Sequence, residues 1–369
     1  MLRGRDSHRI EDEFIVGMIK EAVKSIVEAR VTLTREQARS LLFEILEGDT
    51  EDVDIAALLT ALATRGETVD ELTGFAEAMR ALSVPIPLTD DERVELVDTC
   101  GTGGGGPRTF NISTGAALVA AAAGARVAKH GNRSVTSQCG SADVLEALGV
   151  AVDLPAELAV ECLRATGFMF LYAPALHPAL KRVQPVRRAL GFGTIFNLAG
   201  PLANPAHAPA QVMGVTARDR LMLVANAMAK LGVRRAFVVH GSDGLDELTI
   251  TGESNLAEVR ERTVAMYRTK PEDVGLERST IDMLSGGDAA ANAAMLEGIF
   301  KGETGARRDI VLFNAAAALV VAELAEDIMD GIARAAEAID SGGAWRTLAA
   351  IREFSQDARS AKSIRLQVK

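Results

Sequence analysis

The first 88 residues carry apolar side chains at helical spacing. The two clearest runs are Phe14, Met18, Ala22 and Ile26, then Ala38, Leu41, Leu42 and Ile45. Thr34 followed by Gln37 has the form of a capping box at the start of the second helix. Two further helices are expected over 52–65 and 69–82, and Pro85 and Pro87 end the pattern. Residues 1–88 are therefore predicted to form a small helical bundle domain.

Beyond residue 88, short β-rich runs alternate with helical ones. The expected strands are Val94–Asp98, Arg126–Lys129, Phe168–Tyr172, Gln211–Val215 and Ala236–His240, with two weaker ones at Ala257–Arg260 and Val264–Tyr267. Helices are expected at 114–123, 141–148, 156–165 and 218–231, and in the C-terminal third at 289–299, 308–324, 325–341 and 344–355. This alternation predicts an α/β domain over 89–369, with a central, largely parallel sheet flanked by helices.

The stretch 174–210 interrupts this alternation. It is rich in proline and carries a basic cluster, namely Lys181, Arg182, Arg187 and Arg188. We expect a helical insertion here that packs towards the N-terminal helices.

Composition and charge narrow the class of protein. The 369 residues are 48% hydrophobic and 24% charged, which is typical of a globular chain. A net charge of −10 disfavours nucleic acid or an anionic membrane surface as a partner. The longest apolar run, 115–125, is too short for a spanning helix, which needs about 20 residues.

The charged N-terminus does not have the apolar stretch of a secretory signal. Cys100, Cys139 and Cys162 lack zinc-site or disulfide-framework spacing, so a cytoplasmic location is expected.

A glycine-rich loop follows the first expected strand, with five glycines among residues 101–106. It satisfies the pattern GxGxxG, but Pro107 follows the third glycine, and we expect the next helix to begin only after residues 111–114. In dinucleotide-binding sites an acidic residue about twenty residues further on hydrogen-bonds the ribose, and this chain has Arg126 there instead. Nicotinamide or flavin binding is therefore not expected, and a Walker A motif is absent. A loop without Cβ atoms that leads to a helix start instead predicts a phosphate cradle, against the alternative of a flexible linker.

Two further loops follow expected strands. Residues 129–137, Lys-His-Gly-Asn-Arg-Ser-Val-Thr-Ser, offer cations, an amide and hydroxyls that suit phosphate oxygens. Ligands bind at this carboxyl edge of the strands in open α/β sheets. Residues 240–247, His-Gly-Ser-Asp-Gly-Leu-Asp-Glu, end in adjacent carboxylates, which suggests magnesium shared with phosphate oxygens. The alternative for this third loop is a solvated acidic turn.

The motifs taken together resemble the anthranilate phosphoribosyltransferase family. They are Gly101-Thr102-Gly103-Gly104, residues 109–114, 129–133, 140–149 and 240–247, then His177-Pro178, Pro185-Val186-Arg187-Arg188, residues 194–197 and Asn314-Ala315-Ala316-Ala317. The resemblance covers nearly the whole chain apart from about its first fifteen residues. It implies transfer of the phosphoribosyl group of 5-phosphoribosyl 1-pyrophosphate (PRPP) to the amine of anthranilate, a step of tryptophan synthesis. It also implies a homodimer formed through the helical domain.

The resemblance further implies a set of site residues. PRPP would contact Gly101, Gly104, Gly105, Thr109, Asn111, Ile112, Ser113, Thr114, Lys129, His130, Gly131, Asn132, Arg133, Ser134, Val135, Thr136, Ser137 and Ser141. Anthranilate would contact Gly101, Asn132 and Arg187, with His130 and His177 along its entry path. The metal, Mg²⁺, would be held by Ser113, Asp246 and Glu247.

The implied chemistry needs no general acid or base. The aromatic amine is neutral at pH 7, and pyrophosphate leaves readily once metal neutralises its charge. The protein's work is then alignment and charge stabilisation. Arg187 could pair bidentately with the anthranilate carboxylate.

Two other functions stay open at this point. One is a nucleoside phosphorylase-like enzyme that uses free phosphate, since such phosphorylases share the architecture but carry different residues in the phosphate loops. The other is a non-catalytic phosphoribosyltransferase relative that regulates or binds nucleic acid, which the net charge disfavours.

The chain departs from the family's usual pattern at two positions. Gly105 stands where the family has Asp, and Gly193 stands where it has Arg. Gly193 bears on the packing of the insertion more than on the chemistry. Gly105 removes a carboxylate from the pyrophosphate end of the site, and with it a potential metal partner.

We therefore predict that the parent chain is active with Gly105, because Ser113, Asp246 and Glu247 remain. The substitution Gly105→Asp should shift the magnesium concentration at which the rate is highest. Steady-state rates across a magnesium titration measure this. An unchanged titration profile in the variant would contradict the prediction.

Overall fold

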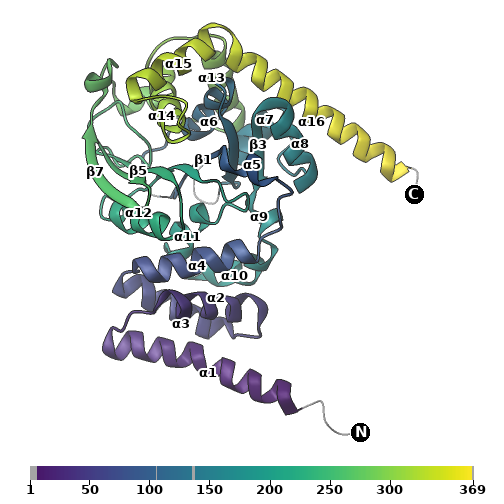
Figure 1. Ribbon diagram of the computed structural model, residues 1–369, viewed down its shortest axis with the longest axis vertical. Coiled ribbons are helices and arrows are strands. Elements are labelled where there is room, and N and C mark those ends of the chain that lie inside the picture. Colours follow the sequence, from purple (N-terminus) through teal and green to yellow (C-terminus); the bar gives the residue numbers. More distant parts are fainter. Residues whose placement is uncertain (1–5, 105, 135–137, 368–369) are drawn as a thin grey trace. The chain divides into compact units, whose positions relative to one another are not determined.

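The computed structural model describes residues 6–104, 106–134 and 138–367, with side chains described from 18 to 360 within these ranges. The chain forms two compact units. The helical unit comprises Met1–Ser83 and His177–Ala203, and the α/β unit comprises Val84–Leu176 and Asn204–Lys369. Figure 1 labels their elements along the chain.

The helical unit is built from two stretches of sequence. Its elements are α1 (Asp6–Ala29), α2 (Arg35–Glu47), α3 (Asp52–Arg65), α4 (Val69–Ala81), the 3-10 helix η1 (Pro178–Arg182), α10 (Gln184–Leu190) and α11 (Ile195–Leu202). The predicted capping box at Thr34 and Gln37 is confirmed, and Thr68 with Glu71 forms a second one at the start of α4. Phe75 of α4 meets Phe196 of α11 edge to face, with ring centroids 5.7 Å apart. The insertion thus packs on the N-terminal helices through buried aromatic area.

Glu71 holds the loops of the helical unit in place. Its side chain is fully buried and accepts hydrogen bonds from the backbone N–H groups of Leu33 at 2.8 Å and Thr68 at 2.9 Å. It also pairs with the buried Arg65 guanidinium. A buried carboxylate is tolerated only when it is paired and hydrogen-bonded in this way, so one side chain fixes both the entry to α2 and the start of α4.

The α/β unit is organised around a seven-stranded sheet. The strands are β1 (Leu96–Gly101), β2 (Arg126–Gly131), β3 (Phe168–Tyr172), β4 (Ala210–Gly214), β5 (Arg235–Gly241), β6 (Ser254–Arg260) and β7 (Thr263–Thr269). Their order is β3-β2-β1-β4-β5-β6-β7. Neighbours among β1 to β5 are parallel, and β6 and β7 add an antiparallel hairpin at one edge. The predicted largely parallel α/β sheet is confirmed.

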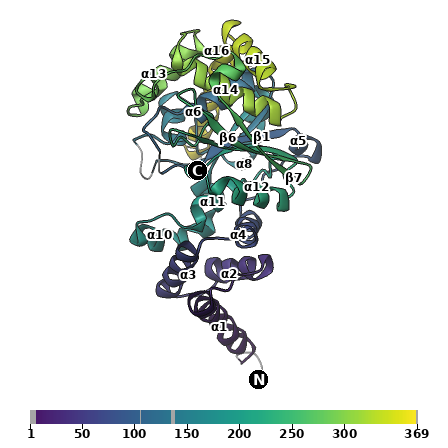
Figure 2. The ribbon, with the colours of Figure 1, turned by 90° about the vertical axis from the view of Figure 1, so that its left-hand side faces the viewer.

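Helices flank both faces of this sheet. They are α5 (Asp90–Val94), α6 (Ile112–Ala122), α7 (Ser141–Ala147), α8 (Ala156–Thr166), α9 (Ala173–Leu176), α12 (Arg220–Lys230), α13 (Ala289–Phe300), α14 (Ala306–Val321), α15 (Ile328–Asp340) and α16 (Gly343–Gln367), with 3-10 helices η2 (Pro271–Val274) and η3 (Ile281–Leu284). Figure 2 shows α6 and α14 beside each other over the strands.

Alternation along the strands divides the core between the two faces. Val97, Val127 and Val212 belong to the larger apolar cluster, which includes α6 and α14. Leu96 and Ala128, one position away, belong to a second cluster that includes α8. Both faces of the sheet are therefore buried, as a parallel sheet requires.

The strand order creates a switch point between β1 and β4. The chain winds outwards from β1 to β2 and β3 on one side, and from β4 to β5 on the other. In open parallel sheets the crevice at the carboxyl ends of two such strands is where ligands bind. The glycine-rich loop leaves β1 at this point.

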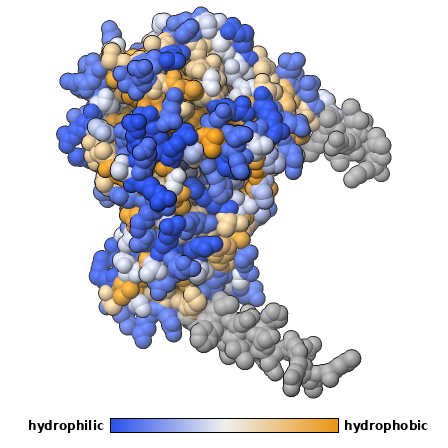
Figure 3. Space-filling view, in the orientation of Figure 1, coloured by the Kyte–Doolittle hydropathy of each residue, from blue (hydrophilic) through white to orange (hydrophobic). Residues whose placement is uncertain are grey.

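The exposed surface is mostly hydrophilic with scattered apolar residues, as Figure 3 shows for one face. Within the described ranges, none of the helices combines the length and the apolar character needed to cross a membrane.

The helical unit also contains a carboxyl group, that of Glu44, whose oxygens are buried without hydrogen-bond partners among the described residues. Burial, together with the charge of Asp54, raises the pKa of Glu44 from an ordinary 4.5 to about 7. Because the folded state holds this proton more tightly than the unfolded chain, the associated stability is complete below pH 4.5 and is lost as the pH rises through 7.

Glu44→Gln should therefore be more stable than the parent chain at pH 8 and close to it at pH 4.5. Urea unfolding followed by far-UV circular dichroism at the two pH values measures the difference. Glu47→Gln, at an exposed position on the same helix, is the control and should follow the parent. If the stability of Glu44→Gln ran parallel to that of the parent across this range, the assignment would fail.

Candidate active site

The glycine loop and the acidic loop meet at the switch point between β1 and β4. Thr102 N–H donates to the Gly214 carbonyl at 3.0 Å, which links the ends of the two strands. A Cβ on Gly101 would overlap the Asp246 carboxylate, and a Cβ on Gly214 would overlap the Asp246 backbone carbonyl. Only glycine at both strand ends therefore allows Asp246 to reach the switch point.

The glycine loop turns back on itself directly after β1. Gly103 and Gly104 adopt φ values of +58° and +83°, a region that other residues rarely occupy. Gly103 N–H donates to Asp246 Oδ2 at 2.9 Å. Gly104 is exposed at the loop, and the predicted site residue Gly105 lies outside the described residues.

The helix after the glycine loop begins earlier than the sequence predicted. We expected it to start after residues 111–114, but α6 begins at Ile112 and Asn111 occupies the N-cap position. The polar residues Asn111, Ser113 and Thr114 suggested a capping segment before the helix. In the structure the buried side chain of Ile112 holds the first helical turn in the core. Ser113 and Thr114 therefore lie in that first turn, where the backbone N–H groups suit an anion.

Asn111 is held by side chains and backbone from two other segments. It makes no side-chain cap bond to its own helix. Its Nδ2 donates to the Cys139 carbonyl at 3.2 Å, and its Oδ1 accepts from Asn292 Nδ2 at 2.9 Å. Thr109 forms an isolated antiparallel bridge with Ser285. Sequence reasoning missed Asn292, because nothing in the local pattern of α13 indicates a long-range partner.

Lys129 lies beneath the glycine loop and not among exposed groups. Its side chain is 2% exposed and its Nζ donates to the Thr99 carbonyl. Burial lowers the pKa of Lys129, and the carboxylates of Asp98, Glu247 and Asp246 oppose that effect. The sequence suggested direct contact with phosphate oxygens, and the structure gives this ammonium group a backbone partner and carboxylates nearby.

Asp98 is a buried acidic residue that the sequence analysis did not include. It accepts from His130 N–H at 3.1 Å and lies 3.4 Å from Gln211 Nε2. Burial raises the pKa of Asp98 to about 6, although Lys129 and hydrogen bonds favour its charged form. The sequence could have indicated this residue, because an acidic side chain in an expected buried strand, three residues before the first glycine of the loop, is unusual.

The second loop is closed by side chains from α7. Arg133 pairs with both Glu146 oxygens at 2.6 and 2.7 Å, and its guanidinium lies 5.8 Å from the Tyr172 ring centroid. Asp143 Oδ2 accepts from Ser134 N–H at 3.0 Å and from Gly140 N–H at 2.8 Å.

The remaining residues of this loop are placed around its two ends. Ser141 Oγ donates to the Asn132 carbonyl at 3.2 Å, and the side chain of Asn132 is exposed. Gly131 ends β2, and His130 before it is buried. The predicted site residues Val135, Thr136 and Ser137 lie outside the described residues.

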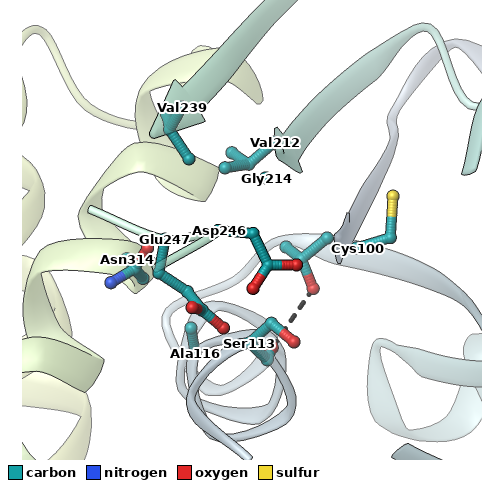
Figure 4. Close-up of a pocket in the computed structure, with 10 residues that line it drawn as sticks. Cys100, Ser113, Ala116, Val212, Gly214, Val239, Asp246, Glu247 and Asn314 are labelled. Carbon is teal, nitrogen blue, oxygen red and sulfur yellow. Dashed lines mark hydrogen bonds between the residues drawn. The ribbon is translucent and has the colours of Figure 1, made fainter. Parts of the chain in front are cut away.

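Ser113, Asp246 and Glu247 line one small cavity with Thr99, Cys100 and Asn314. Figure 4 shows the Asp246 and Glu247 carboxylates on the side of the acidic loop that lies towards Ser113. Glu247 Oε2 is buried and has no hydrogen-bond partner among the described residues. Burial, and then the charges of Asp246 and Asp243, raise the pKa of Glu247 well above its ordinary value.

These groups fit a hard divalent cation. Carboxylate and hydroxyl oxygens are ligands that Mg²⁺ accepts, and a cation would relieve the repulsion between the two carboxylates. Within the described residues, no group of three or more His, Cys, Asp or Glu side chains could hold a metal ion. Mg²⁺ is commonly bound by one or two carboxylates together with water and substrate phosphates, and the donor set here matches that mode.

Arg187 and His177, two of the predicted anthranilate contacts, belong to the helical unit. The Arg187 guanidinium on α10 lies 5.2 Å from the Phe196 ring centroid, and burial lowers its pKa. His177 is 3% exposed, and burial lowers its pKa to about 4. Gly101, His130 and Asn132 belong to the α/β unit. The proposed anthranilate set draws on both units and stays a prediction.

Comparison with known proteins identifies relatives along most of the chain. Residues 93–345 match the model of the glycosyl transferase family a/b domain, and residues 20–83 match its helical bundle domain. An anthranilate phosphoribosyltransferase of Brevibacillus brevis is 50% identical over 323 residues, which cover 88% of this chain and 94% of the relative. One of Pelotomaculum thermopropionicum is 49% identical over 338 residues, covering 92% and 97%.

Solved structures agree with these relatives. The crystal structure of anthranilate phosphoribosyltransferase from Thermus thermophilus has a TM-score of 0.85 at 41% identity, covering 92% of this chain and 99% of that one. The Saccharomyces cerevisiae enzyme in complex with PRPP and Mg has a TM-score of 0.82 at 26% identity, covering 92% and 98%. The resemblance found in the loops is confirmed, and the chain belongs to the anthranilate phosphoribosyltransferase family.

Proposed function

We propose that this chain transfers the phosphoribosyl group of PRPP to the amine of anthranilate, as a step of tryptophan biosynthesis. A bond forms between the anthranilate nitrogen and C1′ of the ribose, the bond from C1′ to the pyrophosphate oxygen breaks, and the amine loses a proton to solvent. The products are N-(5-phosphoribosyl)anthranilate and pyrophosphate. The observation that carries the proposal is the meeting of the glycine loop, the start of α6 and the Asp246–Glu247 pair at one switch point.

The glycine loop and the start of α6 are proposed to bind the phosphates of PRPP. Exposed backbone at Gly104 and the first-turn N–H groups of α6 are suited to anions. Asn111, fixed by Asn292 and Cys139, presents its amide at the same helix start. The residues of the second loop complete the proposed PRPP set named from the sequence.

Magnesium is proposed to be held by Asp246, Glu247 and Ser113. When bound with PRPP, it would supply positive charge to the departing pyrophosphate. The relevant property of this chain is the pair of half-buried carboxylates facing one cavity, with Glu247 Oε2 buried and unpartnered among the described residues. The yeast relative solved in complex with PRPP and Mg supports the use of magnesium together with PRPP.

Anthranilate is proposed to contact Gly101, Asn132 and Arg187, with His130 and His177 lining its path. Arg187 offers a planar guanidinium that can pair with the anthranilate carboxylate. Its packing on Phe196 restricts the orientation of that guanidinium before ligand arrives. Since the aniline nitrogen is neutral and nucleophilic at neutral pH, no side chain is assigned as general acid or base.

The assay that tests this function follows loss of anthranilate fluorescence with PRPP and Mg²⁺ supplied together and singly. Turnover is expected only when both are present. Nucleoside phosphorolysis by the same preparation, without anthranilate turnover, would favour the phosphorylase alternative. A salt-sensitive shift of nucleic acid without any turnover would favour the non-catalytic one.

Asp246→Asn and Glu247→Gln should each raise the magnesium concentration needed for half-maximal rate by at least about tenfold, because each removes one anionic ligand. A magnesium titration at saturating PRPP measures this. Glu253→Gln, an exposed carboxylate beyond the same loop, is the matched control and should keep the parent titration. An unchanged titration in both loop variants would remove the metal assignment.

The partner of the chain is proposed to be a second copy of itself, and its location the cytoplasm. Val27 of α1 and Val53 of α3 are 64% and 67% exposed on the helical unit. The spacing of Cys100, Cys139 and Cys162 is not that of a disulfide framework, in keeping with a reducing compartment.

Light scattering should give twice the mass of one chain, and the double variant Val27→Asp, Val53→Asp should reduce it to that of one chain, because charge replaces apolar area at the contact. Val94→Asp, an exposed valine of the α/β unit, is the control and should stay dimeric. A parent chain that scatters as a monomer would contradict the proposal.

A further inference from the structure

We propose that Asn314 is a positioning residue that sets the geometry of the Asp246–Glu247 carboxylate pair. The inference rests on the proposed function for its catalytic consequence. Asn314 touches no reacting atom in this scheme, and it acts through the backbone of Leu248.

The amide of Asn314 is fully engaged by the backbone. Its Oδ1 accepts from Leu248 N–H at 3.0 Å, and its Nδ2 donates to the Leu248 carbonyl at 2.9 Å. The second Nδ2 proton goes to the Ile310 carbonyl at 2.9 Å. The side chain is 5% exposed and lies on α14, whose residues from Ile310 to Val321 are all buried. A side chain with all three bonds on a buried helix has a single orientation.

Leu248 directly follows the two carboxylate residues, so this contact fixes one end of the pair. The preceding residue, Leu245, is fixed from the other side. Its N–H donates to Asp243 Oδ1 at 3.1 Å, and its carbonyl accepts from Gly241 N–H at 2.9 Å. Asp246 and Glu247 are thus the two residues between two anchored positions, which leaves their backbone little freedom.

Asn314 also reaches the cavity that these carboxylates face. It lines that cavity together with Ser113, Asp246 and Glu247, and Figure 4 shows its amide close to Glu247. Magnesium demands near-ideal octahedral geometry, so small displacements of ligand oxygens weaken its binding. The helix that forms the centre of the core therefore sets the position of the acidic loop.

Loss of the amide would leave both backbone groups of Leu248 without partners. Leu248 is fully buried, and an unsatisfied buried N–H or C=O is costly, so the loop would shift until these groups reach water or another partner. The carboxylates would move with it. A purely structural role would instead lower stability without a selective effect on magnesium.

Ser355 supplies a matched control for the structural role. It is fully buried in α16, accepts from Ala151 N–H at 2.9 Å and donates to the Ile351 carbonyl at 2.7 Å. Ser355→Ala likewise leaves a buried backbone N–H unpartnered, and it lies outside the proposed site.

The first readout is the magnesium titration of Asn314→Leu, with Asn314→Ser as a milder second variant should the first not fold. The half-saturating magnesium concentration should rise about 10- to 100-fold, as for other groups that orient metal ligands. KM for anthranilate should stay within about twofold, because this loop carries none of its proposed contacts. Ser355→Ala should keep the parent titration.

The second readout is hydrogen exchange of the full chain without substrate or metal, followed on peptides that cover 242–250. In the Asn314 variants exchange there should rise at least tenfold while β1 and β5 keep their protection, and Ser355→Ala should leave 242–250 unchanged. This exchange measurement does not depend on activity, so it remains valid even if the parent chain does not turn over anthranilate. Failure of the proposed function can therefore be distinguished from failure of the positioning role of Asn314. Unchanged exchange at 242–250, or a variant whose rate falls with an unchanged magnesium titration, overturns the proposal.

Discussion

The site depends on the close approach of Asp246 to the ends of β1 and β4. Its carboxylate lies against Gly101 and its backbone carbonyl against Gly214, where any side chain would overlap. This contact brings the acidic loop after β5 across to the switch point, where it accepts a hydrogen bond from Gly103. The two glycines therefore decide more than loop conformation. They allow the backbone proposed to bind phosphate and the two carboxylates to lie at the same switch point.

Charge balance around this contact explains why the buried groups occur together. The buried Lys129 is influenced electrostatically by three acidic residues, Asp98, Glu247 and Asp246, each of which favours its charged form. Burial, and then repulsion by neighbouring carboxylates, raises the pKa of Glu247, and burial raises that of Asp98. A bound divalent cation would favour the charged forms of these acidic groups and offset their mutual repulsion. Lys129 therefore interacts directly with the Thr99 carbonyl and electrostatically with these acidic groups, and its proposed effect on phosphate acts through its charge.

The sequence predicted most of the fold and the loops of the site, but not the contacts that hold the loops. Phe168–Tyr172 was predicted to the residue, because five apolar and aromatic residues lie between clear breaks. The start of α6 was placed too late, since Asn111 to Thr114 look like a cap until the burial of Ile112 is known. The order of strands, and with it the β1–β4 switch point, depends on long-range pairing that local patterns do not encode. For the same reason Asn292 and Asn314 could not be assigned roles from the sequence, although Asn314 was part of a recognised motif.

If the reaction needs no general acid or base, as proposed, catalysis depends on the geometry of the site. The groups nearest the proposed chemistry are a glycine-rich backbone and two carboxylates that repel each other. Their positions are fixed by amide and carboxylate side chains behind them. Asn292 holds Asn111 through a hydrogen bond. Asp243 and Asn314 hold the residues on either side of the Asp246–Glu247 pair. Asn292 and Asn314 are buried residues of helices that pack in the core, and Asp243 belongs to the acidic loop itself. The core of the α/β unit thus determines where the acidic side chains lie, and the exposed loops supply the backbone that is proposed to bind the phosphates.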